Sequence, residues 1–455
     1  MNLKTRLASQ SSLMFGMRLV GAGMIVVIQA AIARLWSAEI LGEFLLTMAI
    51  VNLLAMAMPL GFQTVATYFA AEYRANAQGP MLRRFIFRAY SHILMAAIII
   101  GGAGIYLSSD AGGGTALFLA GIVSDDIAFV MERFWIQGAI LSCAVGVVFI
   151  NGAVLVGLKR PYAGYVAEVL FRPMLVIGAF VFALAVSAPN DRLDTMLWFF
   201  SLGYGFVALV HFSVVLSSVG KLPETGGNMK NDSIRWWRFA LPWALIDLAT
   251  SFFFDIDLIM LAGLMDKTAL AIFAVCTRIF SLVAFGVTAV YAVALPDIFE
   301  SAAKADDGEF NRKVGDANLV AAALSLVFLG VILLVGPYIL MIFGPDFLAG
   351  AMPLAILCLA LVVRSVFGPA ALVLSINDRP WASVPAIGAS MVALGIGNFY
   401  LVPVWGLTGA AGSALIAFFV WSVLMWWTAL VITKIDVSVF PRLRQIISAR
   451  LIKEN

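Results

Sequence analysis

The chain consists of long apolar stretches that are separated by short polar ones. A helix needs about 20 apolar residues to cross roughly 30 Å of hydrocarbon, and about twelve stretches come close to or exceed that length. The predicted membrane helices lie at 13–33, 42–66, 86–108, 136–158, 163–187, 195–217, 239–263, 269–295, 317–341, 351–375, 382–402 and 408–432. The pattern therefore predicts an all-α polytopic membrane protein.

Two regions of the chain repeat the same pattern. Residues 40–89 correspond to residues 270–318 at an offset of 229 residues. This offset aligns Phe44 with Phe273, and the basic pair Arg83-Arg84 with Arg312-Lys313. A chain built from two copies of one hydrophobic unit is typical of membrane transporters, in which the substrate lies between the copies.

The repeat predicts two lobes with six helices each around a central cavity. We expect an N-terminal lobe at 1–220, a cytoplasmic linker at 221–238, and a C-terminal lobe with a cytoplasmic tail at 239–455. Because each copy holds an even number of membrane helices, both copies have the same orientation, and the repeats are expected to be parallel.

Composition and charge agree with a membrane location. Hydrophobic residues make up 62% of the 455 positions and charged residues 12%, whereas soluble proteins carry about 25% charged residues. Most of the 29 Lys and Arg residues fall in alternate gaps between the apolar stretches or near the chain ends, which predicts cytoplasmic termini. The cluster of Arg83, Arg84 and Arg88 is first an orientation signal, and it also has the charge to gather anionic headgroups.

Enzymatic chemistry is disfavoured by the motifs that the sequence lacks. No long extramembrane segment and no GxxxxGK[ST] phosphate-binding loop occurs, and Cys143, Cys276 and Cys358 lack metal-ligand spacing. We therefore predict no catalytic residues, no metal site, no nucleic-acid partner and no cofactor other than H⁺ or Na⁺ as a coupling ion. A membrane polysaccharide polymerase or ligase is the less favoured enzymatic alternative.

Ionisable side chains inside the apolar stretches are the candidate functional groups. Each costs roughly 2.5–3.5 kcal/mol to insert, so six unpaired groups would cost on the order of 15–20 kcal/mol. They are therefore expected to face one another, water or a ligand. The six are Arg18, Arg278, Arg364, Asp247, Asp255 and Asp257.

Two interpretations of these arginines are open. In the first, Arg278 or Arg364 pairs with an aspartate of the helix at 239–263 and fastens helices together. In the second, the arginines line a wet cavity for an anion, because guanidinium groups bind phosphate oxygens in a bidentate manner. Arg18 lies one turn from Gly21, on a face of small residues that would let it reach such a cavity.

The three aspartates of the helix at 239–263 are not expected to share one site. On a regular helix, Asp255 and Asp257 project about 200° apart, and Asp247 lies about 80° from each of them. We expect these carboxylates either to couple transport to an ion or to take part in structural pairing.

Several passages, in order along nearly the whole chain, resemble motifs of a known family. They are Ala33-Arg34-Leu35-Trp36 through Leu41-Gly42-Glu43-Phe44, Pro242 with Asp257-Leu258-Ile259-Met260-Leu261, Phe273-Ala274-Val275-Cys276-Thr277-Arg278-Ile279, Phe343-Gly344-Pro345-Asp346-Phe347, Val402-Pro403-Val404-Trp405-Gly406 and Gly409-Ala410-Ala411. Through them the chain resembles the polysaccharide-transporter branch of the multidrug/oligosaccharidyl-lipid/polysaccharide exporter superfamily, the O-antigen and exopolysaccharide flippases.

The resemblance implies a function. It implies that a polyprenyl-diphosphate-linked oligosaccharide is flipped from the cytoplasmic to the outer leaflet of the bacterial inner membrane, by alternating access, for exopolysaccharide or lipopolysaccharide biosynthesis. Implied partners are this lipid-linked substrate, membrane lipids, a polysaccharide polymerase and a chain-length regulator. Candidate substrate-binding residues are Arg18, Arg278, Arg364 and Arg34. The alternative is a cation-coupled multidrug antiporter of the same superfamily, although arginines would repel its cationic substrates.

The charge of this substrate indicates a driving force. A diphosphate carries roughly two negative charges, and moving each charge outward across an inside-negative membrane gains about 2.3 kcal/mol per 100 mV. We therefore expect that the membrane potential alone can drive flipping, without a coupling carboxylate.

Overall fold

The computed structural model describes residues 3–107, 124–220, 222, 233–303, 307–377 and 379–454. Within these residues the chain forms helices and turns without a β-strand, so the predicted all-α class is confirmed. Ten helices among the described residues are long and apolar enough to cross a membrane. All twelve predicted segments fall on helices. The number is ten because two segments are joined at a kink and the segment at 239–263 is divided between two shorter helices.

The chain forms two compact units, unit 1 at Met1–Gly263 and unit 2 at Leu264–Asn455. Unit 1 extends beyond the predicted linker at 221–238, because the helices of the segment at 239–263 pack on other helices of unit 1. Residues 223–232 of that linker lie outside the described residues. The lobe limits inferred from the repeat stay a prediction, since a repeated unit and a packing unit need not have the same limits.

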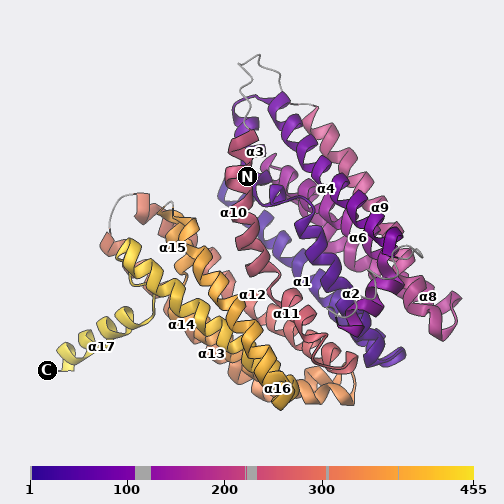
Figure 1. Cartoon of the computed structure of the whole chain (residues 1–455). Helices are drawn as coiled ribbons and strands as arrows, with labels where there is room; N and C mark the ends of the chain where they lie inside the picture. Colours follow the sequence, from indigo (N-terminus) through magenta and orange to yellow (C-terminus); the bar gives the residue numbers. More distant parts are fainter. Residues whose placement is uncertain are drawn as a thin grey trace. The chain divides into compact units, whose positions relative to one another are not determined.

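Unit 1 is organised around the long helix α6, which packs against α2, α3, α4 and α9 (Figure 1). Its helices are α1 (Leu3–Leu35), α2 (Ala38–Ala57), α3 (Phe62–Ala75), α4 (Gly79–Leu107), α6 (Asp125–Gly157), α7 (Pro161–Val166), α8 (Arg172–Val186), α9 (Arg192–Val219), α10 (Ser233–Ser251) and α11 (Phe253–Leu261). α6 begins eleven residues before the predicted helix at 136–158, and it is kinked at Phe134.

Unit 2 is organised around α14, which packs against α12, α13 and α16 (Figure 1). Its helices are α12 (Lys267–Ala303), α13 (Asp307–Met341), α14 (Ala351–Phe367), α15 (Ala370–Ile376), α16 (Val384–Thr433) and α17 (Phe440–Glu454). The predicted helices at 382–402 and 408–432 join in α16, which is kinked at Gly406 with φ 53° and ψ −128°.

The predicted helix at 42–66 is broken. α2 ends at Ala57, and α3 begins after a turn in which Leu60 and Gly61 have φ values of 53° and 84°. A positive φ is incompatible with a right-handed helix and is adopted most readily by glycine. The turn therefore separates two helices where the apolar pattern alone predicted one.

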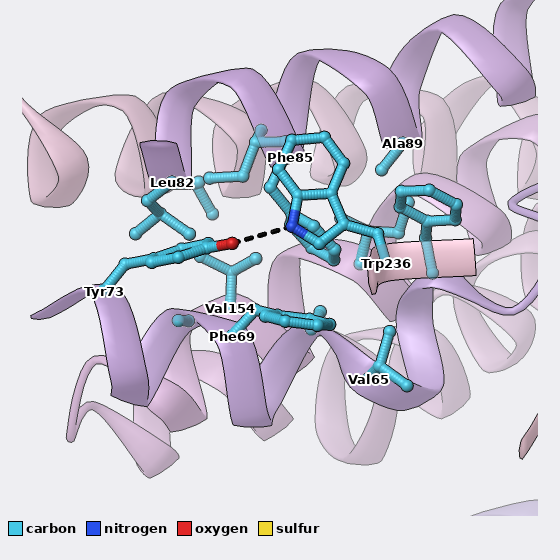
Figure 2. Close-up of a cluster of buried hydrophobic side chains, with 14 of the residues drawn as sticks. Val65, Phe69, Tyr73, Leu82, Phe85, Ala89, Val154 and Trp236 are labelled. Carbon is cyan, nitrogen blue, oxygen red and sulfur yellow. Dashed lines mark hydrogen bonds between the residues drawn. The ribbon is translucent and has the colours of Figure 1, made fainter. Parts of the chain in front are cut away.

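A buried cluster of aromatic rings fixes α10 to α3 and α4 (Figure 2). The ring centroids of Phe69 and Tyr73 lie 5.8 Å apart, those of Phe69 and Phe85 lie 5.4 Å apart, and Trp236 lies 5.4 Å from Phe85. The indole nitrogen of Trp236 donates a 2.7 Å hydrogen bond to the Tyr73 hydroxyl. Large buried rings contribute most of the packing free energy at such a contact, which explains why α10 belongs to unit 1.

Arg235 adds an ion pair beside this cluster. Its guanidinium donates to the two carboxylate oxygens of Glu72 at 2.8 and 2.9 Å. This hydrogen bonding is the main reason that the pKa of Arg235 is raised above its ordinary value. Because both side chains are partly exposed, the pair adds little stability compared with the buried rings.

Candidate functional site

A π turn interrupts the helix at the predicted segment 163–187. α7 runs into the π-helical residues Ala167–Phe171, and α8 continues from Arg172. A π turn accommodates one extra residue in a helical turn and frequently marks a functional site. This turn carries Glu168, and Arg172 follows it directly. Two ionisable groups are thereby placed within an apolar membrane segment.

A glycine lets α1 approach this π turn closely. A Cβ atom on Gly21 would lie 2.1 Å from the carbonyl oxygen of Val169, so a larger residue is excluded there. One turn earlier, the Arg18 guanidinium lies 5.1 Å from the centre of the Tyr165 ring, which is a cation–π contact. The close approach at Gly21 thus places the exposed Arg18 next to the π turn.

A cavity of about 470 Å³ lies beside the π turn, within unit 1. Its polar lining includes Thr67, Tyr165, Glu168, Asp247 and Ser251, and we call it the charged pocket. The positive charges of Arg172 and Arg18 both act on the carboxyl group of Glu168. The pocket therefore has two carboxyl groups in its lining, Glu168 and Asp247, and two arginines close to one of them.

A chain of hydrogen bonds joins Arg172 to Asp255. The Arg172 guanidinium donates to the amide oxygen of Asn52 at 2.7 Å, and the Asn52 amide nitrogen donates to Asp255 at 3.2 Å. An amide can mediate between a cation and a carboxylate because it both accepts and donates hydrogen bonds. Asp255 is thus linked to Arg172 through Asn52, and its role in ion coupling or structural pairing stays a prediction.

The three aspartates of the segment at 239–263 occupy three environments. Asp247 lines the charged pocket and accepts a 2.5 Å hydrogen bond from Ser251, Asp255 contacts Asn52, and Asp257 is fully buried. They are separated as expected, but the assumption of a regular helix was wrong, because the helix breaks between α10 and α11. Their directions therefore follow from the break and not from helical periodicity alone.

Unit 2 contains a cavity of about 300 Å³ at α14. Arg364 lines it, is exposed, and lies with its guanidinium 5.4 Å from the centre of the Trp421 ring. Among the described residues, none that lines the cavity is acidic, and no carboxylate lies within salt-bridge distance of Arg364. We call this cavity the arginine pocket.

One end of the arginine pocket is formed by a polar cluster. The hydroxyl of Tyr291 donates a 2.6 Å hydrogen bond to Asn318, whose amide nitrogen donates a 2.9 Å bond to the carbonyl oxygen of Val437. Gly368, with φ 83°, lies against the same carbonyl group. The segment between α16 and α17 is thereby tied to the helices that hold Arg364.

The other two predicted arginines do not line either pocket. Arg278 is half-buried in α12, and Arg34 is exposed in the last turn of α1. Of the four candidate arginines, the structure thus brings Arg364 into a pocket and Arg18 next to one.

Glu168 and Arg172 were missed at the level of the sequence. They lie within the predicted helix at 163–187 and meet the criterion that selected the other six residues, an ionisable group inside an apolar stretch. A glutamate and an arginine four residues apart inside an apolar stretch are therefore the sequence signal that identifies this pair.

Comparisons with known proteins give matches in structure alone. No protein-family model matches the chain, and no curated protein matches it. A multidrug resistance MATE family transporter of the MOP superfamily, in an inward-facing conformation, aligns over 92% of this chain and 98% of its own, with a TM-score of 0.69 and 14% identity.

Two further solved structures show the same likeness. The lipid II flippase MurJ, in an inward closed conformation, aligns over 92% of this chain and 86% of its own, with a TM-score of 0.69 and 14% identity. A mutant of the Vibrio cholerae MATE transporter VcmN aligns over 93% and 96%, with a TM-score of 0.56 and 14% identity. At this level of identity the similarity shows the fold: the chain has the fold that MATE transporters share with the lipid II flippase.

Proposed function

We propose that this protein flips a polyprenyl-diphosphate-linked oligosaccharide across a bacterial inner membrane, by alternating access and without covalent chemistry. The observation that carries the proposal is the environment of Arg364. A permanently charged guanidinium lies in an apolar span at 345–374, exposed in a pocket whose described lining holds no acidic group. A cation placed there needs water or an anion, and a diphosphate offers oxygens that match its paired N–H groups.

The fold supports transport as the general activity. The neighbours are transporters of one superfamily and a flippase of a lipid, so the same arrangement of helices is compatible with a lipid-linked cargo. Arg18 supplies a second exposed guanidinium, in unit 1, beside the charged pocket. In the proposed cycle Arg364 binds the diphosphate, and the lipid tail stays in the bilayer.

The test is transport in proteoliposomes with a polyprenyl diphosphate that carries a short fluorescent glycan. The membrane potential is collapsed while the proton gradient is kept, and in a second arm the proton gradient is collapsed while the potential is kept. We expect loss of the potential to slow flipping, because outward movement of roughly two negative charges gains about 2.3 kcal/mol per charge per 100 mV. A flipping rate that is unchanged when the potential is collapsed, and that falls when the proton gradient is collapsed, would contradict this mechanism.

A second candidate function, a cation-coupled multidrug antiporter, is favoured by one observation. Glu168 and Asp247 both line the charged pocket of unit 1, where a cationic drug or a coupling ion would find carboxylates. Overexpression in a drug-sensitive strain distinguishes the two functions. Resistance to cationic dyes, without flipping of the lipid-linked glycan, would establish the antiporter.

A further inference from the structure

A third cavity lies apart from both pockets, at the start of α4. It has a volume of about 420 Å³, and its lining consists of Arg83, Arg84, Phe87, Arg88, Ser233 and Trp236. Three of these six residues are arginines, and among the described residues that line it none is acidic. The positively charged end of the backbone dipole of α10, which begins at Ser233, meets the same cavity. The cavity is therefore suited to an anion.

The exposed face of α4 changes from basic to apolar along the helix. Arg84 and Arg88 are exposed near its start, and Phe87 between them is 75% exposed. Leu94 and Ile98 follow Phe87 at spacings of seven and eleven residues, which places them on the same face, and they are 63% and 65% exposed. A ligand that lies along this face meets guanidinium groups first and an apolar strip next.

The length of α4 indicates that its exposed face changes from basic to apolar near the edge of the bilayer. α4 has 29 residues, which is about 43 Å of helix, whereas the hydrocarbon core is roughly 30 Å thick. The excess of about 13 Å corresponds to roughly nine residues, so with the excess at this end Arg83 and Arg84 lie outside the hydrocarbon and Arg88, the tenth residue, lies at its edge. The arginines are thus at the depth of lipid headgroups, and Leu94 and Ile98 are at the depth of acyl chains.

We propose that the arginine cluster and the apolar strip of α4 form a binding site for an anionic phospholipid of the surrounding bilayer. The headgroup phosphate binds Arg84 and Arg88, Phe87 packs against the glycerol region, and an acyl chain lies along Leu94 and Ile98. This lipid is a resident of the bilayer and not the cargo, so the site does not depend on the transported substrate.

The repeat supplies a matched control. Arg312 and Lys313 of unit 2 occupy the positions that correspond to Arg83 and Arg84. There Lys313 forms a 2.9 Å salt bridge with Glu309, so part of the positive charge is already balanced by the protein. Replacing both residues removes the same number of charges from a basic pair that lacks the proposed site.

The experiment is native mass spectrometry of the delipidated full-length protein with dioleoyl phosphatidylglycerol as the probe and dioleoyl phosphatidylcholine as the zwitterionic reference. The wild type is expected to bind the anionic lipid more tightly than the zwitterionic one. The double variant Arg84→Gln, Arg88→Gln is expected to lose about 30-fold in affinity for the anionic lipid, since each basic residue near an anionic headgroup contributes about fivefold. The control Arg312→Gln, Lys313→Gln is expected to change affinity by less than about twofold.

Two further measurements distinguish binding of the whole phospholipid from binding of a free phosphate ion. Phe87→Ser should weaken binding of the phospholipid, because it removes an apolar contact that a free phosphate would not make. Equal affinity for the two lipids, or an equal loss in the control variant, would overturn the proposal. Displacement of the lipid by millimolar inorganic phosphate would also overturn it, because the site would then recognise a free anion. All four replaced arginine and lysine positions are at the surface or half-buried, and an unchanged melting temperature verifies that the variants are folded.

Discussion

The charged pocket of unit 1 and the arginine pocket of unit 2 differ in the ionisable side chains that line them. In unit 1, Glu168 and Asp247 line the pocket and the charges of Arg18 and Arg172 act on Glu168. In unit 2, Arg364 lies in a pocket whose described lining is free of acidic groups. The first pocket has carboxyl groups in its lining and arginines beside it, whereas the second has an arginine and no acidic group in its described lining. In the proposed mechanism, binding of the anionic cargo therefore depends more on unit 2.

The largest effect is expected from Arg364. Arg364→Ala should lower flipping about 100-fold, because it removes a charge-assisted bidentate contact worth roughly 2–3 kcal/mol. Arg364→Lys keeps the charge but loses the fork geometry, so it should restore transport only in part. Initial rates in proteoliposomes measure both, with protein incorporation as the control. Full activity of the alanine variant would remove the basis for the proposed anion site.

A smaller effect is expected from Arg18. Arg18→Ala should reduce transport about tenfold, since the cation–π contact with Tyr165 already satisfies part of its charge. Arg278→Ala provides the comparison within unit 2, where the half-buried side chain lines neither pocket. Complementation of a flippase-deficient strain, at matched protein levels, reports both variants. If Arg18→Ala complements fully, the assignment of Arg18 to the substrate is wrong, and a loss in Arg278→Ala as large as in Arg18→Ala would show that position beside a pocket does not decide the effect.

Glu168 tests whether unit 1 senses protons. Glu168→Gln preserves the shape of the side chain and removes its titratable group. If the charged pocket couples transport to H⁺, the variant should lose the dependence of flux on the proton gradient, with a change of only severalfold in flux driven by the membrane potential. Measurements with each gradient alone separate these effects. Retention of proton dependence would exclude Glu168 as the coupling group.

Two glycines with positive φ, Gly61 before α3 in unit 1 and Gly368 after α14 in unit 2, should affect stability. A Cβ on Gly61 would lie 2.3 Å from the Ala240 carbonyl oxygen, and one on Gly368 would lie 2.0 Å from that of Val437. Both residues have positive φ, so alanine at either position should lower the free energy of unfolding by about 2–4 kcal/mol. Gly23→Ala, with open space at its Cβ, is the control. Thermal unfolding in detergent compares the three variants. An unchanged melting temperature for Gly61→Ala would disprove the tight contact between Gly61 and α10.

The smallest effects are expected from exposed ion pairs. Glu72→Gln in unit 1 and Asp316→Asn in unit 2 remove the partners of Arg235 and Arg442. Each should cost less than about 1 kcal/mol, because exposed pairs are screened by solvent. The pKa of Arg235 is raised, so its stabilising charge is fully present below its unfolded-state pKa and is lost only as the pH rises through the folded-state pKa. The effect of Glu72→Gln should therefore not vary between neutral and mildly alkaline pH in chemical unfolding, and a strong variation would contradict this assignment.

Much of the fold could be predicted from the sequence, because apolar stretches of membrane length dictate helices whatever their partners. The helices at 42–66 and 239–263 show the limit of that argument. Their breaks at Gly61 and Phe252 depend on backbone conformations that hydropathy does not record. In α16 the non-helical φ and ψ of Gly406 interrupt the regular helix between the predicted segments at 382–402 and 408–432, so the apolar pattern located this boundary correctly.

The sequence identified the type of residue at the candidate site, but not the contacts that these residues make. Charge inside apolar stretches selected Arg364 and Arg18, which the structure places in or beside pockets. It did not reveal that Asp255 reaches an arginine through Asn52, because a hydrogen bond between residues 203 positions apart has no local signature. Arg278 was chosen by the same rule as Arg364, and only packing distinguishes the two.

The π turn at Ala167–Phe171 has a consequence for how α8 is phased against its neighbours. The buried stripe of α8 includes Pro173, Val176, Phe180 and Ala183, and Arg172 precedes it. Winding the same residues as a regular α-helix, without the π turn, would rotate everything downstream by about 100° about the helix axis. Arg172 would then leave Asn52, and a different row of side chains would meet α9, so a single inserted residue sets the rotational alignment of half a membrane helix.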